Sequence, residues 1–199
     1  MKQMLLLVAL LGLAITAPAQ DIKLDPPTRS GGKPLMETLN ERRSERAFVQ
    51  KEMPLQTLSD LLWAANGFNR PDKRTAPTAV NKQELELYVI IGAKAYHHDA
   101  RANTLHLVAE GDFTTAIGQP NITEKAAVNI VIVGDGAKTT PKYLYLDAGY
   151  ISQNIYLYAA SAGLGTVARA SYRGPELYKA LKLTEKQEVI LVHPVGFLK

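Results

Sequence analysis

The stretch Glu41-Arg42-Arg43-Ser44-Glu45-Arg46-Ala47-Phe48 is the most informative part of the chain. It places three arginines and a serine hydroxyl within residues 42–46. A guanidinium group is planar and fits two phosphate oxygens at once, and a hydroxyl adds a neutral donor beside it. The stretch therefore predicts either a binding site for a mononucleotide phosphate or a solvated helix end, in which Arg42 and Glu45 form a weak ion pair.

Length and composition leave one compact domain, or two small ones, as the expected organisation. The chain has 199 residues and a formal net charge of +4, with its basic residues scattered rather than clustered. A modest positive excess favours anionic small molecules and does not indicate nucleic-acid binding. The chain contains no cysteine, which excludes disulfides, a thiolate nucleophile, thiolate-bound metal centres and a lipid-modified N-terminal cysteine.

The N-terminus has the pattern of a secretory signal. Lys2 precedes an apolar run over residues 4–15, and Ala17-Pro18-Ala19 supplies small residues for cleavage before Gln20. An uncleaved anchor is the alternative, but the run is short for a bilayer. We expect a signal peptide over residues 1–19, an arm over 20–33 and one domain over 34–199. The mature protein is expected to be periplasmic or secreted, without stable membrane insertion.

The apolar pattern along the rest of the chain predicts an α+β fold, with long helices against a central mixed or antiparallel sheet. A first helix is expected over residues 34–43, with Leu35, Met36 and Leu39 on its inner side, and a polar loop over 69–81. The helix predicted over 142–162 is apolar on most sides, which indicates burial in the core or at a subunit interface. The other helices are predicted over 54–66, 112–117 and 175–181, and strands over 85–91, 104–108, 127–133, 166–168 and 188–193.

Several familiar sites are absent from the sequence or weak. There is no phosphate-binding P-loop and no G-x-S-x-G nucleophile motif, and Gly134-Asp135-Gly136 lacks the third glycine of a dinucleotide fold because position 139 is Thr. No paired-carboxylate pattern indicates glycoside hydrolysis. Three histidines near an expected hairpin leave a metal site possible, but surface histidines are the commoner interpretation. They are His97, His98 and His106, with Asp99 beside them.

Three segments together resemble the nitroreductase-like family of FMN-dependent oxidoreductases. Residues 42–48 are similar to its R-R-S-x-R-x-F signature, and residues 76–83, Ala-Pro-Thr-Ala-Val-Asn-Lys-Gln, to its P-S-x-x-N-x-Q loop before a core strand. Residues 147–154, Asp-Ala-Gly-Tyr-Ile-Ser-Gln-Asn, continuing to Gly163-Leu164-Gly165-Thr166, resemble its long central helix and G-L-G-T ending. The D-A-G-x-x-x-Q-N sequence of residues 147–154 is most similar to the SagB-type branch, whose members oxidise azoline rings in peptides. The resemblance spans about residues 35–197.

The resemblance implies which residues would bind the phosphate of FMN. Arg42 and Ser44 would bind the phosphate, and Arg43 would add charge or contact the ribityl chain. Relatives often continue with a basic tail that helps to hold the phosphate. This chain stops at Lys199, so only that side chain could take the role.

The resemblance also implies which residues would contact the isoalloxazine ring of FMN. Arg46 would reach the N1/O2 edge of the isoalloxazine and stabilise the negative charge that reduction places there; an ion pair with Glu41 or Glu45 is the structural alternative. Asn81 would bind a pyrimidine edge, or would simply form a turn. Backbone amides near Ala170 and Ser171 would approach N5 and O4. Relatives usually carry Glu-Gly or a glycine pair in this loop, so Arg169 would face the substrate pocket or the solvent.

Together these features predict an exported FMN-dependent oxidoreductase that works by a ping-pong mechanism on a small organic substrate. The family resemblance implies an intertwined homodimer with FMN at the interface, no metal and no catalytic side chain. NADH or NADPH would be the donor in a typical relative, but neither is expected in the periplasm. The alternatives are a SagB-type dehydrogenase, a flavin-binding protein without turnover, and a purely structural or interaction protein.

Overall fold

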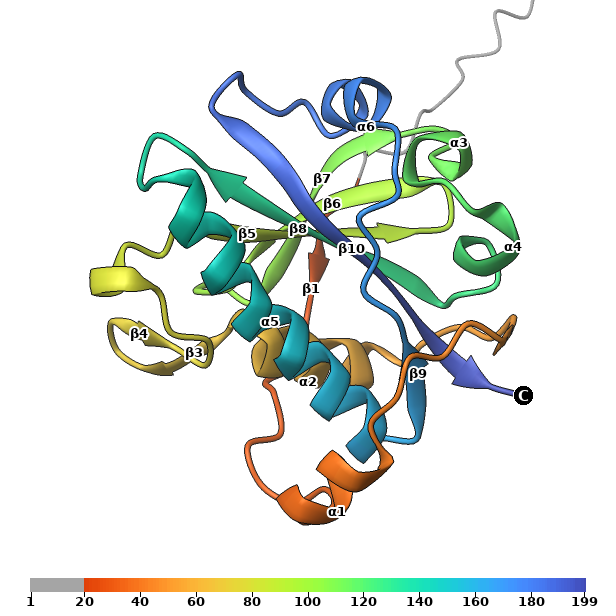
Figure 1. The fold of residues 1–199 in the computed structure, drawn as a ribbon. Helices are drawn as coiled ribbons and strands as arrows, with labels where there is room; N and C mark the ends of the chain where they lie inside the picture. Colours follow the sequence, from red (N-terminus) through yellow and green to blue (C-terminus); the bar gives the residue numbers. More distant parts are fainter. Residues whose placement is uncertain (1–19) are drawn as a thin grey trace, which may run out of the picture.

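The structure is a computed structural model that describes residues 20–199, so the predicted signal peptide lies outside the described residues. Its centre is an antiparallel sheet (Figure 1). Along the sheet the strands are β1 (Ile22–Lys23), β7 (Thr104–Glu110), β6 (Lys94–Asp99), β5 (Leu85–Ile91), β8 (Val128–Asp135), β10 (Gln187–Leu198) and β2 (Phe48–Val49), and β9 (Leu164–Thr166) also pairs with β10. A separate ribbon joins β3 (Phe68–Arg70) to β4 (Lys73–Arg74).

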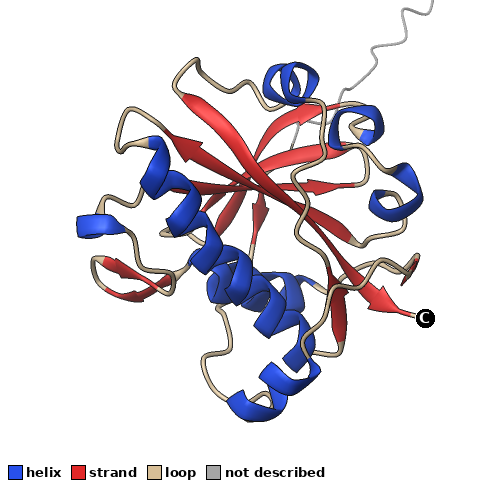
Figure 2. Cartoon of the chain, in the orientation of Figure 1, coloured by secondary structure: helices blue, strands red, loops and turns tan. Residues whose placement is uncertain are grey.

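Helices cover both faces of the sheet (Figure 2). The helices α2 (Leu55–Asn66) and α5 (Pro141–Ser161) pack together over one face, and α3 (Thr114–Ile117) and α6 (Gly174–Ala180) cover the other. The short helices α1 (Leu35–Glu41) and α4 (Pro120–Thr123) pack against α5 and α3 respectively, and a 3-10 turn, η1 (Ala79–Asn81), precedes β5. Pro54 directly precedes α2 and Pro141 opens α5, where a fixed φ favours the start of a helix.

The two covered faces of the central strand β8 explain why residues 130–133 are all apolar. Ile130 and Ile132 join the core on the side of α2 and α5, whereas Val131 and Val133 join the core on the side of α3 and α6. Successive side chains of a strand point to opposite faces, so a strand covered on both faces needs apolar residues at every position. Within residues 20–199, every helix is too short or too polar to cross a bilayer.

The predicted α+β architecture is confirmed, with all sheet pairs antiparallel rather than mixed. The predicted end of the last strand at residue 193 is wrong, because Pro194 stays in register opposite Asn129 and β10 continues to Leu198. The predicted polar loop over 69–81 contains β4 and η1. The arm over 20–33 contributes β1, which pairs with the edge strand β7.

The predicted inner side of α1 is wrong. Leu35, Met36 and Leu39 are 62%, 76% and 43% exposed, whereas Thr38 is the buried residue of this helix. The helix has only seven residues and packs mainly against α5, so these apolar side chains are left uncovered within one chain. They form an exposed apolar surface of a kind that commonly marks an interface.

Candidate functional site

The segment with the predicted phosphate-binding residues runs from the end of α1 to β2, and it is fixed on α5 and β9. The Glu45 N–H donates to the Thr166 carbonyl at 2.8 Å, and Ser44 Oγ lies 2.8 Å from the hydroxyl of Tyr156. The Arg42 guanidinium lies over the Tyr156 ring, 5.0 Å from its centroid. These contacts place the hydroxyl and the first arginine side by side.

Two cations of this segment remain available for an anion. Arg43 pairs with Glu45, and Lys33 pairs with Glu41. Within residues 20–199, Arg42 and Arg46 form no ion pair, so the alternative of an Arg46–Glu pair is wrong, because Arg43 takes the Glu45 carboxylate instead. The half-buried Arg42 and exposed Arg46 guanidinium groups, with the Ser44 hydroxyl beside them, form the donor set that phosphate binding requires.

Lys199 lies next to the arginine-rich segment of residues 42–46. Leu198 pairs with Phe48 in the β2–β10 ladder, so Lys199 continues beside Ala47. A cavity of about 520 Å³ opens next to this junction. It is lined by Lys33, Asn40, Glu41, Arg42, Arg43, Glu45, Tyr156, Ala159, Ala160, Gly163, Leu164, Thr166 and Leu198.

Gly165 lets β9 pass directly beneath this segment. A Cβ at position 165 would lie 2.4 Å from Leu198 Cδ2 and 2.8 Å from Glu45 Cβ, distances that real side chains do not tolerate. The second glycine of the G-L-G-T sequence is therefore needed for the close approach of β9, β10 and the arginine-rich segment. The local sequence thus builds the site where the two motifs meet.

The loop after β9 presents Ala170 and Ser171 at the surface but buries Arg169. The Arg169 guanidinium donates to Gln119 Oε1 at 3.0 Å and to the Ser171 and Ile117 carbonyls at 2.8 and 3.2 Å. Burial lowers the pKa of Arg169. The expectation that Arg169 faces solvent is wrong, because these oxygens of the α3–α4 region and of its own loop satisfy most of its donors.

Asn81 is not brought to the arginine-rich segment within one chain. It lies in η1 at a φ of 58°, and its side chain donates to the Asp72 carbonyl at 3.2 Å. The neighbouring Ala79 N–H donates to Asp147 Oδ2 at 2.8 Å, near the start of α5. Tyr156 lies nine residues further along this helix, which corresponds to about 13 Å. The predicted phosphate and pyrimidine contacts are therefore at separate places on a single chain.

The sequence analysis missed Tyr156 and His193. The His193 ring is buried, with Nε2 2.9 Å from Ser152 Oγ and Nδ1 3.2 Å from Thr166 Oγ1. Burial lowers its pKa to about 3, which keeps it neutral, and it packs edge-on against Tyr156 with centroids 5.5 Å apart. A tyrosine in an apolar helix and a histidine in an apolar strand carry no local signal of this contact.

The three hairpin histidines lie in separate surroundings, and only two of them pair with a carboxylate. His106 Nδ1 lies 2.7 Å from Asp21 Oδ2, and His97 Nε2 lies 3.3 Å from Glu86 Oε2. The interpretation of His98 as a surface residue is wrong, since it is buried and burial lowers its pKa to about 4. Among the described residues, no group of three or more His, Asp or Glu side chains gathers as metal ligands would.

The carboxyl groups of Glu84 and Asp147 are both buried where η1 meets α5. Glu84 is fully buried, and neither of its carboxyl oxygens meets a hydrogen-bond donor in the described part of the chain. Burial raises the pKa of Glu84, and the neighbouring Asp147 carboxyl raises it further. Asp147 accepts the Ala79 N–H, while Val80, Asn81 and Gln83 all adopt positive φ. Burial and the neighbouring Asp147 carboxyl therefore favour the protonated form of Glu84.

Replacing Glu84 by Gln should stabilise the protein more at high pH than at low pH. The folded pKa of Glu84 lies above its unfolded value of about 4.3, so the folded state keeps a proton that the unfolded state releases, and the free energy of unfolding falls as pH rises. The neutral amide of E84Q removes this loss, about 1.4 kcal/mol for each unit of raised pKa. Urea unfolding at about pH 5 and about pH 8 measures the difference.

Asp112 provides the control. Hydrogen bonds from the Thr114 hydroxyl and backbone N–H lower the pKa of Asp112, so this carboxylate stays ionised throughout the same pH range. D112N should therefore change stability by a similar amount at both pH values. A stability difference between E84Q and the wild type that does not change with pH would contradict the assignment of a retained proton.

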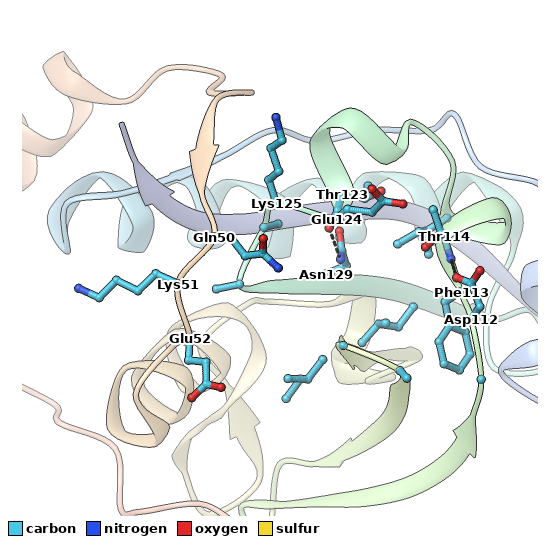
Figure 3. A pocket seen from close by; sticks show the side chains of 18 residues that line it. Gln50, Lys51, Glu52, Asp112, Phe113, Thr114, Thr123, Glu124, Lys125 and Asn129 are labelled. Carbon is cyan, nitrogen blue, oxygen red and sulfur yellow. Dashed lines mark hydrogen bonds between the residues drawn. The ribbon is translucent and has the colours of Figure 1, made fainter.

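A larger cavity, of about 900 Å³, lies elsewhere, between β2, the β5–β6 turn and the α3–α4 region (Figure 3). None of the predicted cofactor residues lines it. Its carboxylates come from Glu52, Asp112 and Glu124, and Figure 3 shows that Lys51 and Lys125 extend outward in different directions. Without converging cations, this cavity does not fit a phosphate group.

Comparison with known proteins identifies the family. The sequence profile of the Nitroreductase family matches residues 39–197. A Methanocaldococcus jannaschii protein with a provisional nitroreductase designation is 27% identical over 182 residues, which are 81% of this chain and 90% of that protein. A crystal structure of a Ralstonia eutropha JMP134 protein, also provisionally designated a nitroreductase, has a TM-score of 0.83 at 35% identity and matches over 90% of each chain.

A more distant structure shares the fold. A chain of the Escherichia coli microcin synthetase complex has a TM-score of 0.67 at 19% identity, over 98% of this chain and 85% of that one, and this likeness shows the fold alone. The profile match and the Ralstonia structure together cover nearly all described residues. The chain belongs to the nitroreductase family and is an oxidoreductase of that type.

Proposed function

We propose that this protein is an exported FMN-dependent oxidoreductase. The observation that carries the proposal is the donor set at the start of β2. Arg42 and Arg46, free of ion pairs among the described residues, lie in one short segment with Ser44, and Lys199 continues the neighbouring strand. These groups fit a phosphate monoester, and Tyr156 connects this segment to Ala168, which lies two residues before Ala170 in the loop after β9.

Each residue has a defined task in this proposal. Arg42, Ser44 and Lys199 bind the phosphate, Arg43 adds charge, Arg46 places a cation where reduced flavin is negative, and the Ala170 and Ser171 amides donate to the ring. When bound, FMN supplies two-electron chemistry in two half-reactions, first with a donor and then with an acceptor, which is a ping-pong cycle. No protein acid or base is required, so the residues bind, orient and tune the cofactor.

We further propose a homodimer in which the site is completed across the interface. Asn81 cannot reach the arginine-rich segment of its own chain, because about 13 Å of α5 separates their anchoring points. The outer face of α5 exposes Leu146 and Tyr150, and α1 exposes Leu35 and Met36. A second copy covering these apolar side chains would bring its Asn81 to the flavin of the first, as the family's intertwined arrangement implies.

Two candidate reactions differ in their electron donor and in their direction, namely reduction or dehydrogenation of the substrate. An exported enzyme would not meet nicotinamides in the periplasm, so a dehydrogenase acting on an azoline-like or other reduced substrate is the second candidate. The D-A-G-x-x-x-Q-N sequence of α5 supports it. The first candidate is reduction of a small nitro- or quinone-type acceptor, which follows from the family, with NADH or NADPH as laboratory donors.

Steady-state kinetics test the proposal. With FMN-reconstituted protein, NADH or NADPH as donor and a quinone as acceptor, we expect parallel double-reciprocal lines, because the two substrates use one site in turn. Intersecting lines would contradict a ping-pong cycle. A flavin that is reduced by dithionite but by neither NADH nor NADPH would favour the dehydrogenase. Export is tested separately: N-terminal sequencing of the exported protein should begin at Gln20.

A further inference from the structure

Tyr156 joins the two segments that carry the predicted cofactor residues. Its hydroxyl accepts the Ala168 backbone N–H at 2.9 Å and lies 2.8 Å from Ser44 Oγ. Ser44 precedes β2, Ala168 follows β9, and Tyr156 itself lies on α5. One phenol therefore connects the arginine-rich segment, the loop of Ala170 and Ser171, and the long helix.

Either hydroxyl can donate in the Tyr156–Ser44 contact, and the surrounding hydrogen bonds favour the phenol as the donor. A phenol has one proton to donate, and its oxygen already accepts from Ala168. Among the described residues, Ser44 Oγ is the only acceptor that the phenol proton can reach. Donation by the phenol to Ser44 leaves the hydroxyl proton of the serine free for a ligand. A chain of hydrogen bonds in one direction also polarises and strengthens each member.

The Tyr156 ring is held on two sides. The Arg42 guanidinium covers one face at 5.0 Å, and His193 packs edge-on with an interplanar angle of 80°. His193 is itself fixed by Ser152 and Thr166. A ring held in this way cannot swing its hydroxyl away from Ser44 without breaking these contacts.

We propose that Tyr156 is a positioning residue that keeps the Ser44 hydroxyl as a donor toward a phosphate monoester, and thereby makes the site select FMN over riboflavin. The inference rests on the proposed function, since it assigns the specificity of that site for the phosphate. Riboflavin presents no phosphate to Ser44, so its affinity does not depend on the direction of this hydroxyl.

The variant Y156F removes the hydroxyl and keeps the ring with its Arg42 and His193 contacts. We expect the FMN dissociation constant to rise about tenfold, the effect of one hydrogen bond to a charged group, while that of riboflavin changes less than about twofold. Fluorescence titration measures both constants. The phosphorus resonance of bound FMN should shift in Y156F, a signature that a general loss of structure would not produce.

Y158F is the matched control, because the Tyr158 hydroxyl on the same helix donates to the Thr57 carbonyl at 3.3 Å and does not touch the site. It should alter neither constant. Should Y156F unfold, the S44A and S44T variants still test the proposal: S44T keeps the hydroxyl and the preference for FMN, and S44A loses it.

A double-mutant cycle separates this role from an independent contact. If Tyr156 acts through Ser44, Y156F should cause no further loss of FMN affinity in an S44A background. Additive losses, or equal losses for FMN and riboflavin, would overturn the inference while leaving the FMN site intact. A wild-type protein that binds neither flavin would instead overturn the proposed function.

Discussion

Replacing Arg42, Ser44 and Arg46 together by alanine should abolish the retention of FMN. Each charged hydrogen bond to phosphate contributes about 1.5–3 kcal/mol, so loss of the Arg42 and Ser44 contacts with the phosphate, together with the Arg46 contact with the ring, should weaken binding by more than about 100-fold. All three side chains are exposed or half-buried, so the fold should survive their removal. Flavin content after desalting, read from the visible absorption spectrum, measures the effect.

A control triple variant removes the same side-chain types elsewhere. Ser30, Arg70 and Arg173 are exposed, and Arg173 makes only a 4.0 Å pair with Glu176. S30A/R70A/R173A changes the net charge by the same amount and should retain FMN. If both triple variants lose flavin equally, general electrostatic attraction is sufficient and the specific phosphate site is wrong.

Placing aspartates on the outer face of α5 should separate the dimer and release FMN. Leu146 and Tyr150 are 54% and 51% exposed and lie one helical turn apart on this face. Covering two carboxylates with a second apolar surface would cost several kcal/mol. L146D/Y150D should therefore be monomeric by sedimentation, and its FMN dissociation constant should rise more than about tenfold because the partner's contribution is lost.

The isosteric control N69D/N121D adds the same two negative charges at exposed positions away from α5. It should remain a dimer with normal flavin content. A wild-type protein that sediments as a monomer and still binds FMN tightly would contradict the shared site. So would an L146D/Y150D variant that is monomeric but keeps full affinity.

The sequence predicted the features that depend on neighbouring residues. Residues 127–133 are apolar apart from Asn129, which indicated a central strand, and β8 is buried on both faces. The G-L-G-T ending was identified from its letters, and the clash at a Cβ on Gly165 shows why that glycine is needed. Arg42 and Ser44 were recognised because they lie side by side in the chain.

Features that depend on distant partners could not be predicted. Ser44 and Tyr156 are 112 positions apart, and Ser152 and His193 are 41 apart, so no local pattern connects them. Glu84 directly precedes a strand and carries no local sign of burial, and only the packing of α5 places it beside Asp147. The inner face of α1 was predicted wrongly because a single chain has no surface that covers Leu35, Met36 and Leu39.

A crystal structure with FMN tests the central claim most directly. The account predicts that a phosphate oxygen lies within hydrogen-bond distance of Ser44 Oγ and the Arg42 guanidinium, with Asn81 of a second copy against the ring. A phosphate found instead in the cavity between Gln50, Phe113 and Asn129, with Ser44 and Arg42 free, would contradict the claim.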